Sequence, residues 1–200
     1  MHKTLEAIYK NLVRLTTQED SSDPSLWTYI REDKYLNGLL RPGFHALLMY
    51  RIGRWASQGS SRRQPCLWLA SAMAVFIRNF YGIELYWTAD IGRKLYLGHQ
   101  GSILFHPHCK IGNNCVIRQG TTIGASEEWD PDAEAPVLGD NVQVGAGAKV
   151  LGRIRIGNNV RIGPNAVVMT DVPDNSTVMA PPARIITWGE SEVRTDQWSG

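Results

Sequence analysis

Aliphatic or aromatic side chains recur at every sixth position between residues 85 and 168 of this 200-residue chain. The series slips by two residues once, stops between residues 124 and 137, and then resumes with the same spacing. Glycine often follows these positions, and a small side chain often stands four residues after them. The positions are Leu85, Ile91, Leu97, Phe105, Ile111, Ile117, Ile123, Leu138, Val144, Val150, Ile156, Ile162 and Val168.

A period of six matches neither an amphipathic helix nor simple strand alternation. It is typical of a hexapeptide solenoid, in which each repeat supplies one short strand and one corner. The aliphatic side chains point into the prism, and glycine or asparagine occupies corners where φ is positive. We therefore predict a mainly β fold built as a parallel β-helix. A sandwich with regularly spaced strands is the alternative, and the constant phase of the series disfavours it.

The first 82 residues lack this period and show helical patterns instead. Helices are expected over residues 3–17, 24–35, 44–57 and 65–81. The predicted organisation is an α-helical N-terminal domain (1–82), a β-helix domain (83–186) with a looped-out insertion (125–137), and a C-terminal tail (187–200).

The stretch 66–77 is almost wholly apolar but too short to span a bilayer. A buried or subunit-facing helix is favoured, and association with a membrane surface is the less favoured alternative.

Composition and charge argue against a nucleic-acid-binding protein but do not identify an activity. The net charge is +2 without a basic run, so nucleic acid is not an expected partner. No signal-peptide pattern opens the chain, which predicts a cytoplasmic protein. Cys109 and Cys115 fall on small inward positions, where they are expected to pack as buried thiols. His106 and His108 point to opposite sides of a strand without a suitable third ligand, so no metal is expected.

His99 stands on the rung that is two residues too long, where it is expected near a corner and facing outward. An exposed imidazole on a rigid edge can act as a general base, although a surface histidine without a role fits the ladder equally well.

Four segments are similar to the serine acetyltransferase branch of the hexapeptide acyltransferases: residues 43–55, 91–102, 144–163 and 172–186. Residues 82–84 also resemble the colanic acid acetyltransferases of that branch. The resemblance implies a left-handed β-helix and direct acetyl transfer from acetyl-CoA, its co-substrate, to an acceptor hydroxyl. It also implies a homotrimer, with a dimer of trimers as the larger alternative.

The resemblance assigns roles residue by residue. His99 matches the family's catalytic base, and Glu84 stands where the family has an aspartate that orients the histidine. The coenzyme contacts map onto Ala125 and Ala146, and a lysine near the nucleotide phosphates corresponds to Arg161. Ser126 extends the small-residue stretch that begins at Gly124, where the pantetheine arm can approach the backbone.

The acceptor side departs from the family pattern. Gly98, Glu134 and Ala135 replace the family's aspartate, arginine and histidine, of which the last two bind the serine carboxylate. Asp33 aligns loosely with a further acceptor-binding aspartate, and Trp129 in the insertion is a candidate for stacking on a sugar. We therefore expect a sugar or polysaccharide hydroxyl as acceptor. L-Serine is the alternative, and an inactive β-helix scaffold is a second alternative.

Overall fold

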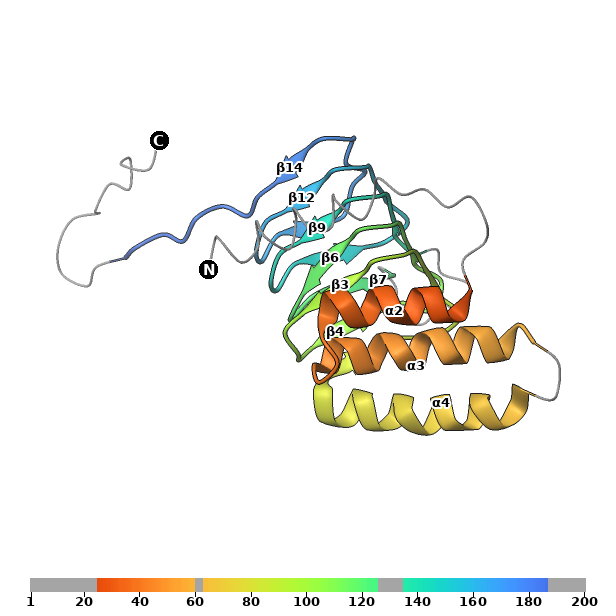
Figure 1. Cartoon of the computed structure of the whole chain (residues 1–200). Helices are drawn as coiled ribbons and strands as arrows, with labels where there is room; N and C mark the ends of the chain where they lie inside the picture. The colour runs from red at the N-terminus through yellow and green to blue at the C-terminus, as the bar shows by residue number, and fades with distance from the viewer. Residues whose placement is uncertain (1–24, 60–62, 126–134, 187–200) are drawn as a thin grey trace.

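The computed structural model describes residues 25–59, 63–125 and 135–186, and within them a solenoid stands on a layered set of helices (Figure 1). The strands form three parallel sheets in which each strand pairs with the third strand along the chain, except that β12 pairs with β14. Sheet A contains β1 (Ile83–Glu84), β4 (Ile103–Phe105), β7 (Thr122–Gly124), β10 (Lys149–Leu151) and β13 (Val167–Val168). Sheet B contains β2 (Asp90–Ile91), β5 (Lys110–Ile111), β8 (Val137–Leu138) and β11 (Arg155–Ile156). Sheet C contains β3 (Tyr96–Gly98), β6 (Val116–Arg118), β9 (Gln143–Val144), β12 (Arg161–Ile162) and β14 (Thr177–Val178).

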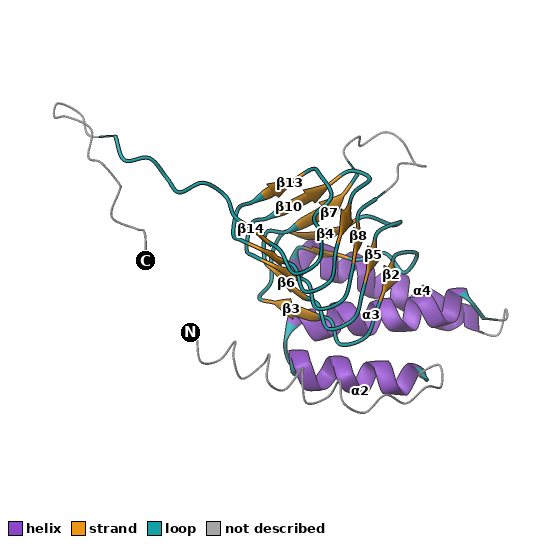
Figure 2. Ribbon diagram, turned by 90° about the horizontal axis from the view of Figure 1, so that it is seen from above, coloured by secondary structure: helices purple, strands orange, loops and turns teal. Residues whose placement is uncertain are grey.

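The three sheets form the three sides of a prism (Figure 2). The predicted ladder residues fill its interior: every one of them is at most 4 % exposed. Because a strand of two or three residues cannot bury a core alone, stacking of coils supplies one continuous apolar interior. The predicted fold class, a left-handed parallel β-helix preceded by helices, is confirmed.

The register shows where the coils depart from regularity. Lys149 pairs with Val167, an offset of 18 residues that equals three hexapeptides. Tyr96 pairs with Val116, an offset of 20, because the loop after β3 carries two extra residues. Val116 pairs with Gln143, an offset of 27, because residues 126–134 interrupt the intervening coil. The chain therefore keeps its sheets in phase by placing all extra length at corners.

Three helices of the described chain precede β1: α2 (Leu26–Asn37), α3 (Pro42–Ser57) and α4 (Gln64–Phe76). They correspond to the predicted segments 24–35, 44–57 and 65–81, whereas the segment 3–17 lies outside the described residues. A short π-helix, η2 (Ile77–Tyr81), extends α4 and ends at Gly82, whose φ of 62° is left-handed. None of the described helices is long and apolar enough to cross a membrane.

The first coil of the solenoid has an open edge, and α2 and α3 cover it with polar side chains. The Tyr50 hydroxyl donates to the Ala89 carbonyl and accepts from the Ile91 amide, both at 3.0 Å. Arg51 donates to the carbonyl oxygens of Ile91 (2.8 Å) and Gly92 (2.7 Å). These side chains replace the strand that would otherwise pair with this edge, so its buried backbone groups are satisfied.

Candidate active site

His99 lies in the loop between β3 and β4, where its side chain is exposed to solvent. Its φ of 68° places it in the left-handed region, and Gly101 and Ser102 also have positive φ. Such backbone is uncommon for residues other than glycine and is often found at functional sites. Within the described part of the chain, the His99 side chain makes no hydrogen bond. The imidazole is therefore available to a ligand.

The backbone on both sides of His99 is held firmly by neighbouring coils. On the side of the helical domain, the Ile103 amide donates to the carbonyl of Gly82, the residue before β1, at 2.9 Å. On the side of the second coil, the Gln119 amide donates to the Gly98 carbonyl at 3.1 Å. A Cβ atom at Gly82 would lie 3.0 Å from the Ser102 amide nitrogen, so the two backbones are in close contact. The extra residues thus form a constrained protrusion.

The strand that leads to His99 is positioned by the helical domain. Asn37 is 1 % exposed; its amide nitrogen donates to the Leu95 carbonyl and its oxygen accepts from the Leu97 amide, both at 2.9 Å. A Cβ atom at Gly43 would lie 2.8 Å from the Leu97 carbonyl oxygen, so α3 can pack this closely only with glycine there. Sequence analysis missed both residues as contributors to the site, because their partners are about sixty residues away.

Glu84 lies half-buried on β1, and its Oε1 accepts a hydrogen bond from the Tyr86 hydroxyl. This bond, together with partial burial, raises the pKa of Tyr86 to about 12, so Tyr86 remains a donor at neutral pH. In the register Glu84 pairs with Leu104 on β4, the strand that follows the His99 loop. No hydrogen bond joins Glu84 to His99 among the described residues. The structure thus brings the two to adjacent coils and leaves their predicted pairing untested.

The corners between sheet C and sheet A stack into a column along the solenoid, which we call the corner column (residues 98–102, 119–121, 145–148 and 163–166). Backbone hydrogen bonds connect its levels: Gly120 to Gly101, Gly147 to Gln119, and Asn165 to Ala146, each at 2.9 Å. His99 occupies the first level and Ala146 the third, so about 10 Å of small-residue backbone separates them, given the usual strand spacing.

Two further residues belong to this column or lead into it. Arg161 is exposed at the start of β12, the strand that enters the fourth level. Gln119, on the level above His99, has a side-chain oxygen that is inaccessible to solvent and has no hydrogen-bond partner in the described structure. An unpaired buried acceptor is costly, which makes Gln119 a candidate ligand contact. At the equivalent corner position the third level has Ala146 and the fourth has Pro164.

The other predicted site residues are placed elsewhere or fall outside the described residues. Ala125 follows β7 and lies at the opposite edge of sheet A from the corner column. Ser126, Trp129 and Glu134 lie outside the described residues.

Asp33 is 1 % exposed, and its Oδ2 accepts a 2.9 Å bond from Arg51 Nε. Burial raises the pKa of Asp33, an effect that Arg51 opposes. In this structure Asp33 therefore belongs to a buried ion pair and does not face an acceptor site.

His106 and His108 lie at the corner after β4 with ring centroids 5.4 Å apart, so the expectation that they point to opposite sides of a strand is wrong. His106 Nδ1 accepts from the His108 amide at 3.2 Å, and partial burial together with His108 lowers the pKa of His106. The described residues contain no group of three or more histidine, cysteine or acidic side chains arranged to hold a metal ion. Cys109 and Cys115 are fully buried, and burial raises the pKa of each thiol to about 12.

Comparisons with known proteins add independent information. Residues 135–169 match the family model described as "Bacterial transferase hexapeptide (six repeats)". The serine acetyltransferase of Helicobacter pylori is 36% identical over 170 residues, which cover 85% of this chain and 91% of that protein. The serine acetyltransferase of Bacillus subtilis is 34% identical over 154 residues, which cover 77% of this chain and 68% of that protein.

Solved structures show the same similarity. The soybean serine acetyltransferase apoenzyme superposes with a TM-score of 0.67 at 30% identity, over 83% of this chain and 71% of that chain. Serine acetyltransferase from Neisseria gonorrhoeae, solved in complex with serine, superposes with a TM-score of 0.65 at 29% identity. The latter match covers 92% of this chain and 75% of that chain.

Proposed function

Because this chain belongs to the serine acetyltransferase family, we propose that it transfers the acetyl group of acetyl-CoA to the hydroxyl of L-serine. The expectation that a sugar or polysaccharide hydroxyl is the acceptor is wrong. It rested on residues that replace the family's carboxylate-binding side chains, of which Glu134 lies outside the described residues. The curated relatives and solved neighbours are serine acetyltransferases over most of this chain, which favours the L-serine alternative.

The observation that carries this proposal is the position of His99 on the first level of the corner column. His99 takes the proton from the serine hydroxyl while that oxygen attacks the thioester carbonyl. A new C–O ester bond forms, the C–S bond breaks, and the proton is passed to the departing CoA sulfur. The constrained backbone around His99 holds the imidazole in place between the two substrates.

The corner column provides a surface suited to the coenzyme. Glycine and alanine at Gly120, Ala146 and Gly147 leave the backbone accessible to a pantetheine arm. The side-chain oxygen of Gln119 is buried and unpaired, and a rotation of this side chain toward the column would let it accept from an amide N–H of that arm. Arg161 supplies a planar cation for the nucleotide phosphates. We propose that Ala125, at the other edge of sheet A, and the following residue Ser126 contact coenzyme bound to an adjacent subunit of a homotrimer.

Glu84 is proposed to orient His99 when substrates are bound, in the role that the family gives to aspartate. Trp129 and Asp33 remain predictions without support from the described contacts, and Asp33 is already paired with Arg51. We expect the reaction to take place in the cytoplasm, in line with the cysteine usage.

A thiol-release assay with acetyl-CoA and L-serine tests this function. His99→Ala should lower kcat by about two to four orders of magnitude, the usual contribution of a general base, while CoA binding persists. His108→Ala is the matched control, because His108 is also exposed and lies in the same coil. Glu84→Gln should lower kcat by about tenfold. Full activity of His99→Ala, or turnover of saccharides without turnover of serine, would contradict the proposal.

A further inference from the structure

The two residues of this chain that match the family's carboxylate-binding pair, Glu134 and Ala135, carry no positive charge. L-Serine has a carboxylate next to its reacting hydroxyl, and proteins bind carboxylates most strongly through charge-assisted hydrogen bonds from arginine or lysine. If L-serine is the acceptor, as the proposed function states and as this inference assumes, a cation elsewhere near His99 binds that carboxylate.

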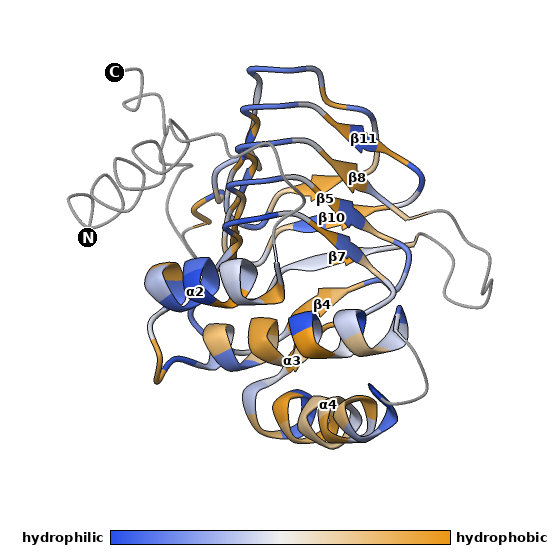
Figure 3. Ribbon diagram, turned by 45° about the vertical axis from the view of Figure 1, so that its right-hand side comes forward, coloured by the Kyte–Doolittle hydropathy of each residue, from blue (hydrophilic) through white to orange (hydrophobic). Residues whose placement is uncertain are grey.

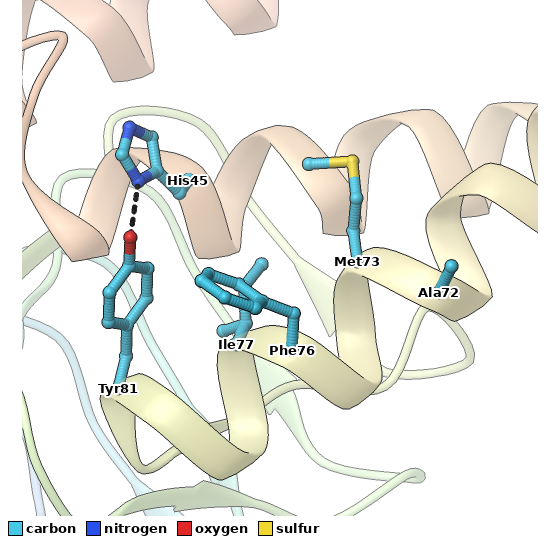
Figure 4. A pocket seen from close by; sticks show the side chains of 6 residues that line it. All are labelled: His45, Ala72, Met73, Phe76, Ile77 and Tyr81. Atoms are coloured by element: carbon cyan, nitrogen blue, oxygen red, sulfur yellow. Dashed lines mark hydrogen bonds between the residues drawn. The ribbon is translucent and has the colours of Figure 1, made fainter.

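The cavity in the helical domain does not supply this cation. It has a volume of about 310 Å³ and lies between α3 and the α4–η2 junction (Figure 4). Much of its wall belongs to α4, which Figure 3 shows to be largely apolar. Its polar groups are already bonded: His45 Nε2 donates to the Leu39 carbonyl at 3.0 Å, and His45 Nδ1 lies 3.3 Å from the Tyr81 hydroxyl. Neither group is a permanent cation, so a carboxylate is not expected there.

Three cations stand on the described strands that enter or leave the corner column: Arg118 on β6, Lys149 on β10 and Arg161 on β12. Lys149 is occupied, because its Nζ donates to the Gly120 carbonyl at 2.7 Å and lies 3.0 Å from Thr122 Oγ1. Arg161 leads into the fourth level, where it is assigned to the nucleotide phosphates. Arg118 leads into the second level, directly next to the level of His99, and is the cation that remains.

Arg118 occupies a position of sheet C that the other levels of the column give to glycine. It pairs with Gly98 in the register, and the same position on the third and fourth levels is Gly145 and Gly163. Ile117 points into the prism and is fully buried, so strand alternation directs Arg118 to the outside. Its glycine neighbours have no side chain that could pair with it. Among the described residues the guanidinium has no hydrogen bond or ion pair.

The stem of Arg118 lies beside the residue that precedes His99. A Cβ atom at Gly98 would lie 3.6 Å from Arg118 Cγ and 3.1 Å from Tyr96 Cε1. Leu36 of α2 packs against the cluster of Tyr96 and Val116, and the half-buried Arg118 follows at the end of this cluster next to the corner column. Because Gly98 has no side chain, it neither pairs with Arg118 nor separates it from the His99 loop.

We propose that Arg118 binds the carboxylate of L-serine through two parallel N–H···O bonds while the serine hydroxyl lies at His99. The planar fork of a guanidinium matches the two oxygens of a carboxylate. The carboxylate keeps its charge throughout acetyl transfer, so Arg118 binds the substrate and the transition state equally well. Arg118 therefore determines acceptor specificity: it favours a hydroxyl compound with a carboxylate over a neutral alcohol.

Steady-state kinetics of the full chain with L-serine and with its neutral analogue L-serinamide test this inference. The wild type should prefer L-serine. Arg118→Gln should raise the KM for L-serine by roughly ten- to a hundredfold with kcat little changed, and leave the KM for L-serinamide unchanged. Arg118→Lys should keep part of the preference, because lysine retains the charge without the fork. The matched control is Arg155→Gln, because Arg155 is exposed on sheet B, which does not border the corner column.

Three results with Arg118→Gln would overturn the inference and leave the proposed function intact. The first is an unchanged KM for L-serine. The second is an equal loss with both acceptors, which would make Arg118 a structural residue. The third is a raised KM for acetyl-CoA alone, which would place the coenzyme phosphates at Arg118. A wild type that does not acetylate L-serine would overturn the proposed function, and this inference with it. Equal urea midpoints of the variants and the wild type serve as the control for folding.

Discussion

The first coil of the solenoid and its later coils satisfy their backbone groups by different means. In the first coil the partners come from another part of the chain: Asn37, Tyr50 and Arg51 reach down from α2 and α3. Arg51 is anchored by Asp33, so an ion pair sits between helix and sheet with both side chains at most 4 % exposed. The first coil is therefore stable only when the helices are in place.

The later coils are joined by side chains of the repeat itself. Asn158 Oδ1 accepts from the Asp140 amide at 2.8 Å, and Asp174 Oδ1 accepts from the Asn158 amide at 2.7 Å. Beside this series, Asn141 donates to Asn159 and Asn159 donates to Asn175 through their side-chain amides. Each of these coils thus carries the groups that fasten it to the next.

The difference explains where the solenoid can carry chemistry. The later coils vary in length as well: the coil between Lys149 and Val167 has the regular 18 residues, whereas the offset from Val116 to Gln143 is 27. The first coil is held from outside, so it tolerates two extra residues and a histidine with positive φ. The first coil, which carries the candidate base, is joined to the next coil by the bond from the Arg93 amide to Asn113 Oδ1, and the helical domain supports its other edge.

The largest loss of stability is expected from Arg51→Met. This substitution removes the cation that supports the first coil but keeps a side chain of similar length. It leaves Asp33 buried without its ion-pair partner and the carbonyl oxygens of Ile91 and Gly92 without donors. The free energy of unfolding should fall by about 3–5 kcal/mol. Urea denaturation at one fixed protein concentration measures it.

Arg54→Met is the matched control for this substitution. The Arg54–Asp90 pair is partly exposed, with side chains 31% and 60% accessible, and the Ala89 carbonyl that also accepts from Arg54 keeps the Tyr50 hydroxyl as a donor, so the substitution should cost about 1 kcal/mol. The double variant Asp33→Leu/Arg51→Met should recover part of the loss, since no unpaired charge is left. Equal costs for Arg51→Met and Arg54→Met would show that the first coil does not depend on the buried pair.

A smaller effect is expected from Asn37→Ala, which separates stability from activity. It leaves the Leu95 carbonyl and the Leu97 amide unpaired, two residues before His99. Stability should fall by about 2–3 kcal/mol, and kcat by roughly tenfold as the imidazole loses its fixed position. Asn158→Ala makes the same substitution in the exposed series, where about 1 kcal/mol and no change in kcat are expected. Loss of kcat in both variants would refute a specific role of Asn37.

The contrast between the repeating coils and the non-repeating contacts of the helical domain also explains which features could be predicted from the sequence. The period of six repeats in every coil, so the ladder from Leu85 to Val168 revealed the interior and the sheets before any contact was known. His99 was also found, because a two-residue slip in a strict repeat is visible locally. Contacts of the helical domain have no period, so the sequence did not show that Asn37 and Gly43 support β3.

The site was less predictable than the fold. Asp33 was matched to an acceptor-binding residue by loose alignment, but the structure pairs it with Arg51, a partner that only the packing of α2 against α3 reveals. The acceptor was misjudged because substitutions in a loop were weighed above similarity along the whole chain. Gln119 was overlooked, because an unpaired side-chain oxygen can be recognised only in three dimensions.

The smallest change in stability is expected from a substitution at Lys94 that makes the first coil resemble the later coils. Lys94 occupies the corner that Asn114, Asn141, Asn159 and Asn175 occupy in later coils, with the same φ of 57–59°. The side-chain nitrogens of Asn141 and Asn159 each donate to the side-chain oxygen of the asparagine one coil later. The Oδ1 atom of Asn114 is buried and has no donor among the described residues.

Lys94→Asn should supply that donor and stabilise the protein by about 0.5–1 kcal/mol. Burial lowers the pKa of Lys94, so the folded state binds the lysine proton less tightly than the unfolded chain does. The wild type therefore gains stability as pH rises toward the ordinary lysine pKa, and the advantage of Lys94→Asn should shrink there. Parallel urea titrations at neutral and alkaline pH measure both effects. A destabilised Lys94→Asn at neutral pH would mean that the first coil cannot adopt the asparagine series, and that its support comes from the helices alone.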